Sequence, residues 1–486
     1  MPEIRTAIES FLAAARQPVV IEPGEDPIPI RQDNFVLGGT PARPAIECWS
    51  TSKNLNRRIS AIHAERPGKL ELATELFGGR KGRLLFVDLA RAGNANATRQ
   101  GDRLKFREQF RLALNRQYPD WKIAELSTDP DLEHTLSPSY PRALLRKGSS
   151  GMAAIGASED SSDPDGALSF GLIWLDYLRR REPRLSIGGL LLFLPIGTEV
   201  NTCHRVRHLD PAMAQVAVFV HGPQGVEEVV HPEDYTNFTT RVEPLRVPVL
   251  TGEMESWLCR LEGLDGVQQI RRPNGTVSLS LRGVEFARTS GMELLFGLER
   301  KHAGSLAEAE GLASGLARMR RHDAEDRHNL LFLRHPEAWL ESQIRANVPG
   351  IDGRLLPAPI YSQAPQIASA ERGILDLLGV DFEGRLTVIE IKATEDLHLP
   401  LQALDYWMRV KWHLERGDFA RAGYFPGITV RPDPPRLLLV APALEFHPTN
   451  ETLLRYFPSE VAVERVGLGI EWRRELKVVL RQTCRS

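Results

Sequence analysis

The chain has 486 residues, of which 42% are hydrophobic and 26% charged, and its net charge at pH 7 is −2. This composition excludes a disordered or fibrous protein, and the length predicts two to four domains. The near-neutral charge argues against a protein that coats DNA, because such proteins are usually basic, but it does not decide whether the chain binds nucleic acid.

Membrane and secreted classes are not indicated either. The longest strongly apolar run, Ile187 to Gly197, is too short to span a bilayer. Residues 1–16 lack the basic start and apolar centre of a secretion signal, so we expect a cytoplasmic protein that does not bind membranes. The four cysteines lie far apart and predict neither a disulfide framework nor a zinc site. Cys203-His204 supplies at most half a metal site, and we interpret the two as isolated residues.

The first part of the chain reads as a small β-rich domain over residues 1–92. Short apolar runs alternate there with dense proline and glycine, which is typical of strands joined by turns. A polar stretch over 91–102 is expected to separate this domain from a helix over 103–118.

An α/β domain is predicted over residues 93–300. It contains an expected helix over 167–181 and an apolar strand over 189–194. Asn274-Gly275 lies between two β-like runs and predicts a hairpin turn. No motif of a phosphate-binding loop, zinc protease or serine hydrolase occurs here, so the role of this domain stays open.

A linking helix is predicted over residues 301–334, because Ala, Glu, Leu and Arg dominate its centre. The last domain is placed at 335–486. Its informative feature is an expected β-hairpin with strands over 373–378 and 385–392.

Three charged residues interrupt this apolar hairpin. Asp376 lies in the first strand, while Glu390 and Lys392, two positions apart, project from one face of the second. Charges among Ile, Leu and Val need partners or a metal ion. Two converging carboxylates offer the hard oxygen ligands that Mg²⁺ prefers. The alternative is an amphipathic hairpin with a solvated face and a chance Glu-x-Lys triplet.

The neighbouring elements favour the metal site. An expected helix over 335–347 carries Glu341, Gly384 lies in the hairpin turn, and Gln402 and Tyr406 share one face of the helix that follows. In this order the segment resembles the PD-(D/E)xK nuclease superfamily, particularly its RecB-like and NucS-like branches. One departure is Leu375, because the family usually has proline or a small residue before the aspartate.

The chain as a whole is expected to be a multidomain α/β protein. The resemblance covers only the last domain, and it implies a restriction-endonuclease-like fold there, in which helices flank a mixed central sheet. It implies that Asp376 and Glu390 coordinate Mg²⁺, or Mn²⁺ in its place, with the backbone carbonyl of Ile391 as a further ligand. Lys392 would stabilise the charge that develops on the phosphate.

The other residues keep two interpretations each. Glu341 would reach the site through water or a second metal ion, or else lie on the surface. Gln402 would position the water at the metal or bind the substrate backbone. Tyr406 would contact substrate or only pack. A further set follows in the same helix and beyond it, and would contact phosphates or form a solvated basic face: Arg409, Lys411, Arg416 and Arg421.

The expected function is therefore metal-dependent hydrolysis of phosphodiester bonds, endo- or exonucleolytic, with DNA as the expected substrate and RNA as an alternative. The N-terminal domains would recognise substrate, a protein partner or a second subunit of a homo-oligomer. A non-catalytic module that binds nucleic acid or protein with the same fold is the competing hypothesis. The sequence leaves repair, restriction and defence roles open.

Residues 100–220 repeat the element order of this last domain: a helix, an apolar strand, a helix containing Leu-Asp-Tyr, and a second apolar strand. At the place of the Glu-x-Lys triplet they read Ile155-Gly156-Ala157. One hypothesis is a degenerate nuclease-like domain without a metal site, and any other α/β fold is the alternative.

Overall fold

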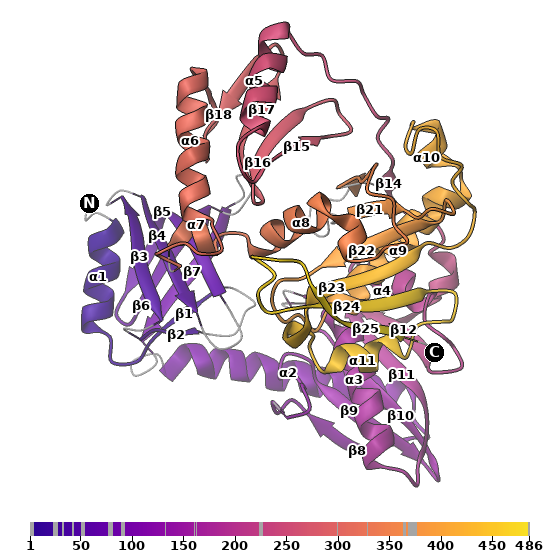
Figure 1. The fold of residues 1–486 in the computed structure, drawn as a ribbon. Helices are drawn as coiled ribbons and strands as arrows, with labels where there is room; N and C mark the ends of the chain where they lie inside the picture. Colours follow the sequence, from indigo (N-terminus) through magenta and orange to yellow (C-terminus); the bar gives the residue numbers. More distant parts are fainter. Residues whose placement is uncertain are drawn as a thin grey trace. The chain divides into compact units, whose positions relative to one another are not determined.

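The computed structural model describes most of the chain, whose helices and strands are drawn in Figure 1. The chain divides into two compact units. Unit 1 comprises Met1–Glu199 and Val216–Val230, and unit 2 comprises Val200–Gln215 and His231–Ser486. The described residues are 4–22, 28–31, 34–40, 43–49, 54–75, 81–88, 93–131, 133–159, 161, 163–222, 227–298, 300–327, 329–362, 366–367 and 377–484.

Unit 1 begins with a seven-stranded sheet in the order β2-β1-β7-β6-β5-β4-β3. Ile8 of helix α1 (Ile4–Ala14) is buried in the core of this sheet with Ile46, Leu70 and Phe86. The β-rich N-terminal region expected from the sequence is therefore confirmed. Its strands are β1 (Pro18–Ile21), β2 (Ile28–Pro29), β3 (Phe35–Thr40), β4 (Arg43–Trp49), β5 (Asn54–Arg66), β6 (Lys69–Glu75) and β7 (Lys81–Asp88).

The second sheet of unit 1 has the order β13-β12-β11-β10-β9-β8. Helix α2 (Gly93–Gln117) begins at Gly93 rather than at Arg103, because the polar stretch before Arg103 holds no proline to end a helix. Helix α3 (Gly166–Arg181) agrees with the predicted one. The strands are β8 (Lys122–Ser127), β9 (Arg142–Lys147), β10 (Ser150–Gly156), β11 (Ser186–Pro195), β12 (Gln215–His221) and β13 (Glu227–Val230).

Unit 2 contains a five-stranded antiparallel sheet with its own core. The predicted hairpin is present, since β15 pairs with β16 around Asn274-Gly275. Helix α6 (Leu306–Met319) begins at a capping box of Ser305 and Glu308, and it buries Ala313 and Leu316 in this core. The predicted linking helix is therefore part of a packed region, and residues 93–300 span two sheets with separate cores. The elements are α5 (Gly252–Glu262), β15 (Val267–Arg271), β16 (Val277–Leu281), β17 (Val284–Ser290), β18 (Glu293–Phe296) and β19 (His302–Ala303).

The last part of unit 2 is a mixed sheet in the order β21-β22-β23-β24-β25. Strand β22 runs antiparallel to β21 and parallel to β23, and β24 is parallel to β23. Ile389 and Ile391 lie in one core with Trp339 of α8 (Pro336–Ala346), while α9 (Leu399–Glu415) packs against β22 and β23. The strands are β21 (Leu377–Val380), β22 (Leu386–Ile391), β23 (Arg436–Pro442), β24 (Ala462–Leu468) and β25 (Val478–Cys484).

The β21–β22 turn requires its glycine. Gly384 has φ +87°, and a Cβ at this position would collide with the carbonyl oxygen of Thr429. Asp381 closes the turn, since its carboxylate accepts hydrogen bonds from the backbone N–H groups of Glu383 and Arg385, at 3.0 and 2.8 Å. The remaining elements of the chain are α4 (Glu199–Val206), β14 (Thr240–Arg241), α7 (Leu330–Leu333), β20 (Gln366–Ile367), α10 (Asp418–Arg421), α11 (Thr449–Leu454) and the 3-10 turns Pro232–Asp234, Val348–Gly350 and Ala443–Glu445.

The second sheet of unit 1, which has the additional strand β8, and the last sheet of unit 2 share the order of their central elements. In both, a helix precedes an antiparallel strand pair, β9–β10 in the first and β21–β22 in the second. A second helix then leads to β11 or β23, which runs parallel to the second strand of the pair. The N–H of Ala157 donates to Phe193 O and that of Lys392 to Val440 O, which places Ala157 where the other sheet has Lys392. The repeated order expected from the sequence is thus present, while a nuclease origin of the first copy stays a hypothesis.

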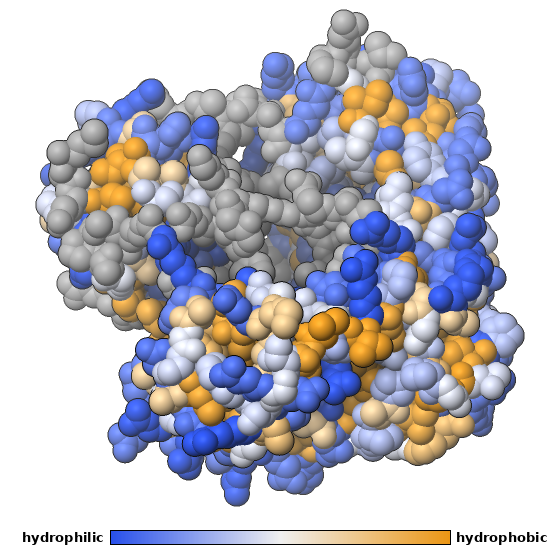
Figure 2. All heavy atoms as spheres, turned by 90° about the horizontal axis from the view of Figure 1, so that it is seen from above, coloured by the Kyte–Doolittle hydropathy of each residue, from blue (hydrophilic) through white to orange (hydrophobic). Residues whose placement is uncertain are grey.

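The surface face in Figure 2 is mixed, with hydrophilic residues over much of it and hydrophobic ones in patches between them. Among the described residues, no helix is both long and apolar enough to cross a membrane.

Candidate active site

Glu390 lies in a strand that is otherwise apolar apart from Thr387. Every residue of β22 is buried, and Glu390 is 3% exposed. Its neighbours Ile389 and Ile391 face the core that contains α8, so the alternation of a strand turns Glu390 to the opposite face. Burial of Glu390 excludes the solvated face that was the alternative interpretation of this hairpin. A carboxylate in such a place needs hydrogen bonds, a cation or a metal ion to be stable.

Lys392 continues the parallel ladder just beyond β22. Its N–H donates to Val440 O at 3.0 Å, so it lies on the same face of the strand as Glu390. The Lys392 Nζ is 3.4 Å from Asp396 Oδ2, and its side chain is 17% exposed. The ammonium group is thus held near the carboxyl end of β22 and keeps access to solvent.

Glu337, which the sequence pattern does not indicate, reaches the same place from α8. It lies in the first turn of that helix, and its carboxylate accepts a hydrogen bond from the backbone N–H of Ala393. Burial raises the pKa of Glu337 and nearby Asp396 adds to this, while the charge of Lys392 opposes it. The sequence contains one signal for Glu337: it is an acidic residue in the first turn of the core helix, one turn before Glu341.

Glu341 has different neighbours. It forms an ion pair with Arg345 on the same helix and lies in the field of Arg272. Burial raises the pKa of its carboxyl, and Arg345 lowers it. The structure therefore brings Glu337, rather than Glu341, to Lys392.

The helix that follows carries Gln402 and Tyr406 one turn apart, as expected. Gln402 is half-buried in α9, and its N–H donates to His398 O at 3.0 Å. Tyr406 is 6% exposed, which fits its packing interpretation. The side chain of Ile391 is buried in the core, so a contribution of this residue to a metal site would come from its backbone.

Asp376, the other expected metal ligand, lies outside the described residues. Its sequence neighbour Leu377 pairs with Ile389, which directly precedes Glu390. In the described part of the chain, no three His, Cys, Asp or Glu side chains gather closely enough to hold a metal ion. A metal site would therefore depend on Asp376 as well as Glu390.

The loops after β22 and β23 are joined at this edge of the sheet. The N–H of Glu395 donates to a carboxylate oxygen of Glu445 at 3.1 Å, and His447 Nε2 lies 3.9 Å from Glu395 Oε1. Asn450 Nδ2 donates to Asp396 O at 3.1 Å. Open α/β sheets bind ligands at the carboxyl ends of their parallel strands. The candidate residues thus lie where such a fold accommodates a substrate.

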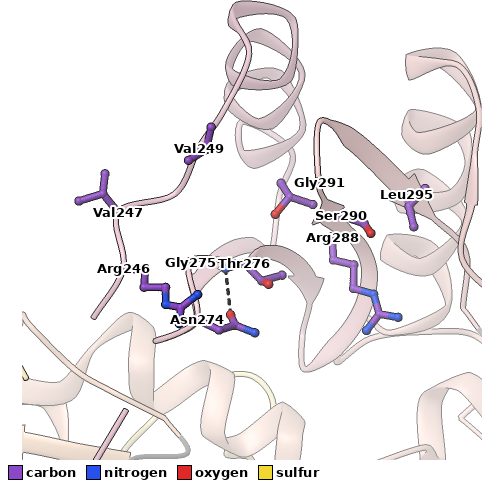
Figure 3. A pocket seen from close by; sticks show the side chains of 11 residues that line it. Arg246, Val247, Val249, Asn274, Gly275, Thr276, Arg288, Ser290, Gly291 and Leu295 are labelled. Atoms are coloured by element: carbon purple, nitrogen blue, oxygen red, sulfur yellow. Dashed lines mark hydrogen bonds between the residues drawn. The ribbon is translucent and has the colours of Figure 1, made fainter. Parts of the chain in front are cut away.

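A separate hollow of about 510 Å³ lies in the part of unit 2 that holds β15–β19 (Figure 3). Arg246 and Arg288 line it from two sides, next to the exposed side chains of Val247 and Val249. Its lining residues include no carboxylate, histidine or cysteine. This hollow suits binding rather than acid–base or metal chemistry.

Searches of protein-family models, of curated proteins and of solved structures return no match to this chain.

Proposed function

We propose that the part of unit 2 around β21–β25 hydrolyses phosphodiester bonds of nucleic acid, with DNA as its substrate, in a metal-dependent reaction. The observation that carries this proposal is the burial of Glu390 at the carboxyl end of β22, two residues before Lys392. The element order supports it, because α8, β21, β22 and α9 follow one another as the resemblance to PD-(D/E)xK nucleases implies.

The donor set fits Mg²⁺ or Mn²⁺. Glu390 and Asp376 would hold the ion with the carbonyl of Ile391, and all three offer the oxygen atoms that these hard cations prefer. When bound, the ion lowers the pKa of a water molecule and neutralises charge on the phosphate.

The protein residues have separate tasks in this proposal. Lys392 donates to a non-bridging phosphate oxygen, whose charge grows in the transition state. Asp396, 3.4 Å from Lys392 Nζ, positions that ammonium group. Glu337 holds the loop after β22 through the N–H of Ala393, and Gln402 orients the attacking water or the substrate backbone.

The test is incubation of the purified chain with labelled single-stranded, double-stranded and branched DNA and with RNA, in Mg²⁺, Mn²⁺ or EDTA. We expect cleavage of DNA with either metal and none in EDTA. The variant to compare with the unaltered chain is Glu390→Gln. Glu383→Gln is its matched control, because Glu383 lies in the turn of the same hairpin and its side chain is 76% exposed. Equal cleavage in EDTA and Mg²⁺ would contradict the proposal.

One observation favours the competing function, a non-cleaving nucleic-acid-binding module. Arg246 and Arg288 line the hollow of about 510 Å³ in unit 2, and its lining residues include no carboxylate, histidine or cysteine. Calorimetric titration with Mn²⁺ separates the two functions: heat of binding that disappears in Glu390→Gln supports the nuclease, and binding of DNA without any binding of metal supports the module. In either case, unit 1 would recognise substrate, a protein partner or a second copy of the chain.

A further inference from the structure

A second hollow in unit 2, of about 360 Å³, lies at the carboxyl end of α9. The segment around β14 forms one wall, and the end of α9 with α10 forms the other. The backbone supports this arrangement, since the N–H of Leu245 donates to Ala422 O at 2.9 Å. Its lining residues are Thr240, Arg241, Val242, Pro244, Trp412, His413, Arg416, Asp418, Arg421 and Ala422.

A chain of three side chains runs through the wall. His413 Nε2 is 2.8 Å from Thr240 Oγ1, and His413 Nδ1 is 2.6 Å from Asp418 Oδ2. The side chain of His413 is only 1% exposed. Because the carboxylate of Asp418 accepts from Nδ1–H, it fixes the ring so that Nε2 faces the threonine hydroxyl. The hydroxyl is thereby held at one position on the wall of the hollow.

The charge around this hydroxyl is positive. Three arginines line the hollow, against the single carboxylate of Asp418, which already interacts with His413 and Arg421. Arg416 is stacked over the ring of Trp412, with 4.4 Å between its Cζ and the ring centroid. Arg241 is 3.4 Å from a carboxylate oxygen of Glu243, yet its side chain remains 76% exposed. The side chain of Arg421 is 69% exposed, so the guanidinium groups of Arg241 and Arg421 are accessible to a ligand.

We propose that this hollow binds a phosphate group, with Arg241, Arg416 and Arg421 as its cationic ligands and the Thr240 hydroxyl as an oriented neutral partner. Guanidinium groups stay charged at any physiological pH and donate bidentate hydrogen bonds to phosphate oxygens. A hydroxyl beside His and Asp also occurs in hydrolases that use a nucleophile. Here the ring is buried and the surrounding charge is cationic, which fits anion binding better than acyl transfer.

The hollow is distinct from the candidate active site. Both lie along α9, but Gln402 and Arg416 are separated by about 21 Å at the rise of an α-helix. The phosphate is either that of a small phosphate monoester or one at the end or in the backbone of a nucleic acid. Phosphate binding here does not require the proposed nuclease activity.

The test is calorimetry on the full chain in EDTA, so that no metal-dependent cleavage occurs. The probes are inorganic phosphate and a short single-stranded oligonucleotide with either a 5′-phosphate or a 5′-hydroxyl. We expect saturable binding of a phosphate-bearing probe, weakened at least about tenfold in Arg416→Gln and in Arg421→Gln, which is about 1.4 kcal/mol for each lost contact. Thr240→Val should weaken binding, and Thr240→Ser should retain it.

Arg431→Gln is the matched control, since Arg431 is a partly exposed arginine of unit 2 that pairs with Glu383 and Asp433 outside the hollow. Tighter binding of the 5′-phosphorylated oligonucleotide than of inorganic phosphate would identify a nucleic-acid phosphate as the ligand, and the reverse would identify a small phosphate. Absence of binding by the unaltered chain, or equal binding in the Arg416, Arg421 and Arg431 variants, would overturn the proposal. None of these outcomes depends on whether the chain cleaves DNA.

Discussion

Glu337 accepts a hydrogen bond from the backbone N–H of Ala393, which ties the first turn of α8 to the loop after β22. Glu341, one turn further along α8, is instead paired with Arg345. Under the proposed function, Glu337→Gln should lower kcat about tenfold to a hundredfold, because the loop that carries Lys392 and Asp396 loses a charged acceptor. Glu341→Gln is the matched control and should change kcat less than twofold. A larger loss in the Glu341 variant than in the Glu337 variant would show that Glu341 is the glutamate that acts at the site, as expected from the sequence.

Lys392 should contribute to the rate and not to the fold. Its side chain retains solvent contact, and methionine in Lys392→Met preserves most of the apolar stem that packs there. We expect a loss of about a hundredfold to a thousandfold in cleavage rate, the size typical of one lost donor to a developing oxyanion. The melting temperature should stay close to that of the unaltered chain. Rates near the original value in a folded Lys392→Met variant would exclude the lysine from the chemistry.

The stability of unit 2 should fall as the pH decreases from 6.5 to 4. His204 is 5% exposed, and burial, assisted by the charge of Arg409, lowers its pKa to about 4. Below pH 6.5 the unfolded chain binds a proton there that the folded chain does not, so stability is present above that pH and is lost on acidification. The loss amounts to at most about 3 kcal/mol for a shift of this size.

Urea denaturation at pH 7 and pH 4.5 measures this effect. His204→Gln should flatten the pH dependence, whereas His322→Gln, at a largely exposed position, should leave it unchanged. An identical slope in the His204 variant and the unaltered chain would show that another group is responsible.

Arg436 should be required for stability but not for chemistry. It begins β23, at the opposite end of that strand from the candidate site, and its Nη2 lies 3.0 Å from Glu464 Oε1 and also contacts Asp352. Burial alone would raise the pKa of Asp352, but hydrogen bonds from Arg354 and Arg436 lower it to about 2. Arg436→Met leaves two buried carboxylates with fewer cationic partners and should cost about 3–5 kcal/mol of folding free energy. Thermal unfolding checks this, with Arg431→Met as the exposed control; a shift below about 2 °C would contradict it.

The hairpin and the helices around it could be predicted from the sequence because local signals specify them. Apolar runs of strand length, a glycine that only a turn accommodates, and Gln402 and Tyr406 at helical spacing correspond to β21, β22 and α9. The repeat of element order in the two sheets was visible for the same reason, since buried helices and parallel strands leave strong apolar patterns.

Other features depend on tertiary contacts that no local pattern reports. The α6 helix resembles a linker in composition, yet Ala309 and Ala313 are buried against β16 and β17. Glu337 and Glu341 lie on one face of α8, and only the position of Ala393 distinguishes them. The Thr240–His413–Asp418 chain joins residues up to 178 positions apart, so spacing gives no indication of it.

The most direct test of the central claim is single-turnover cleavage of labelled DNA by the unaltered chain and by Glu390→Gln, each in Mg²⁺ and in EDTA. Glutamine preserves the shape of the side chain and removes the charge that would bind the ion. We predict cleavage by the unaltered chain in Mg²⁺ alone and a loss of at least about a thousandfold in Glu390→Gln, with both proteins folded. Undiminished Mg²⁺-dependent cleavage by a folded Glu390→Gln variant would contradict the account.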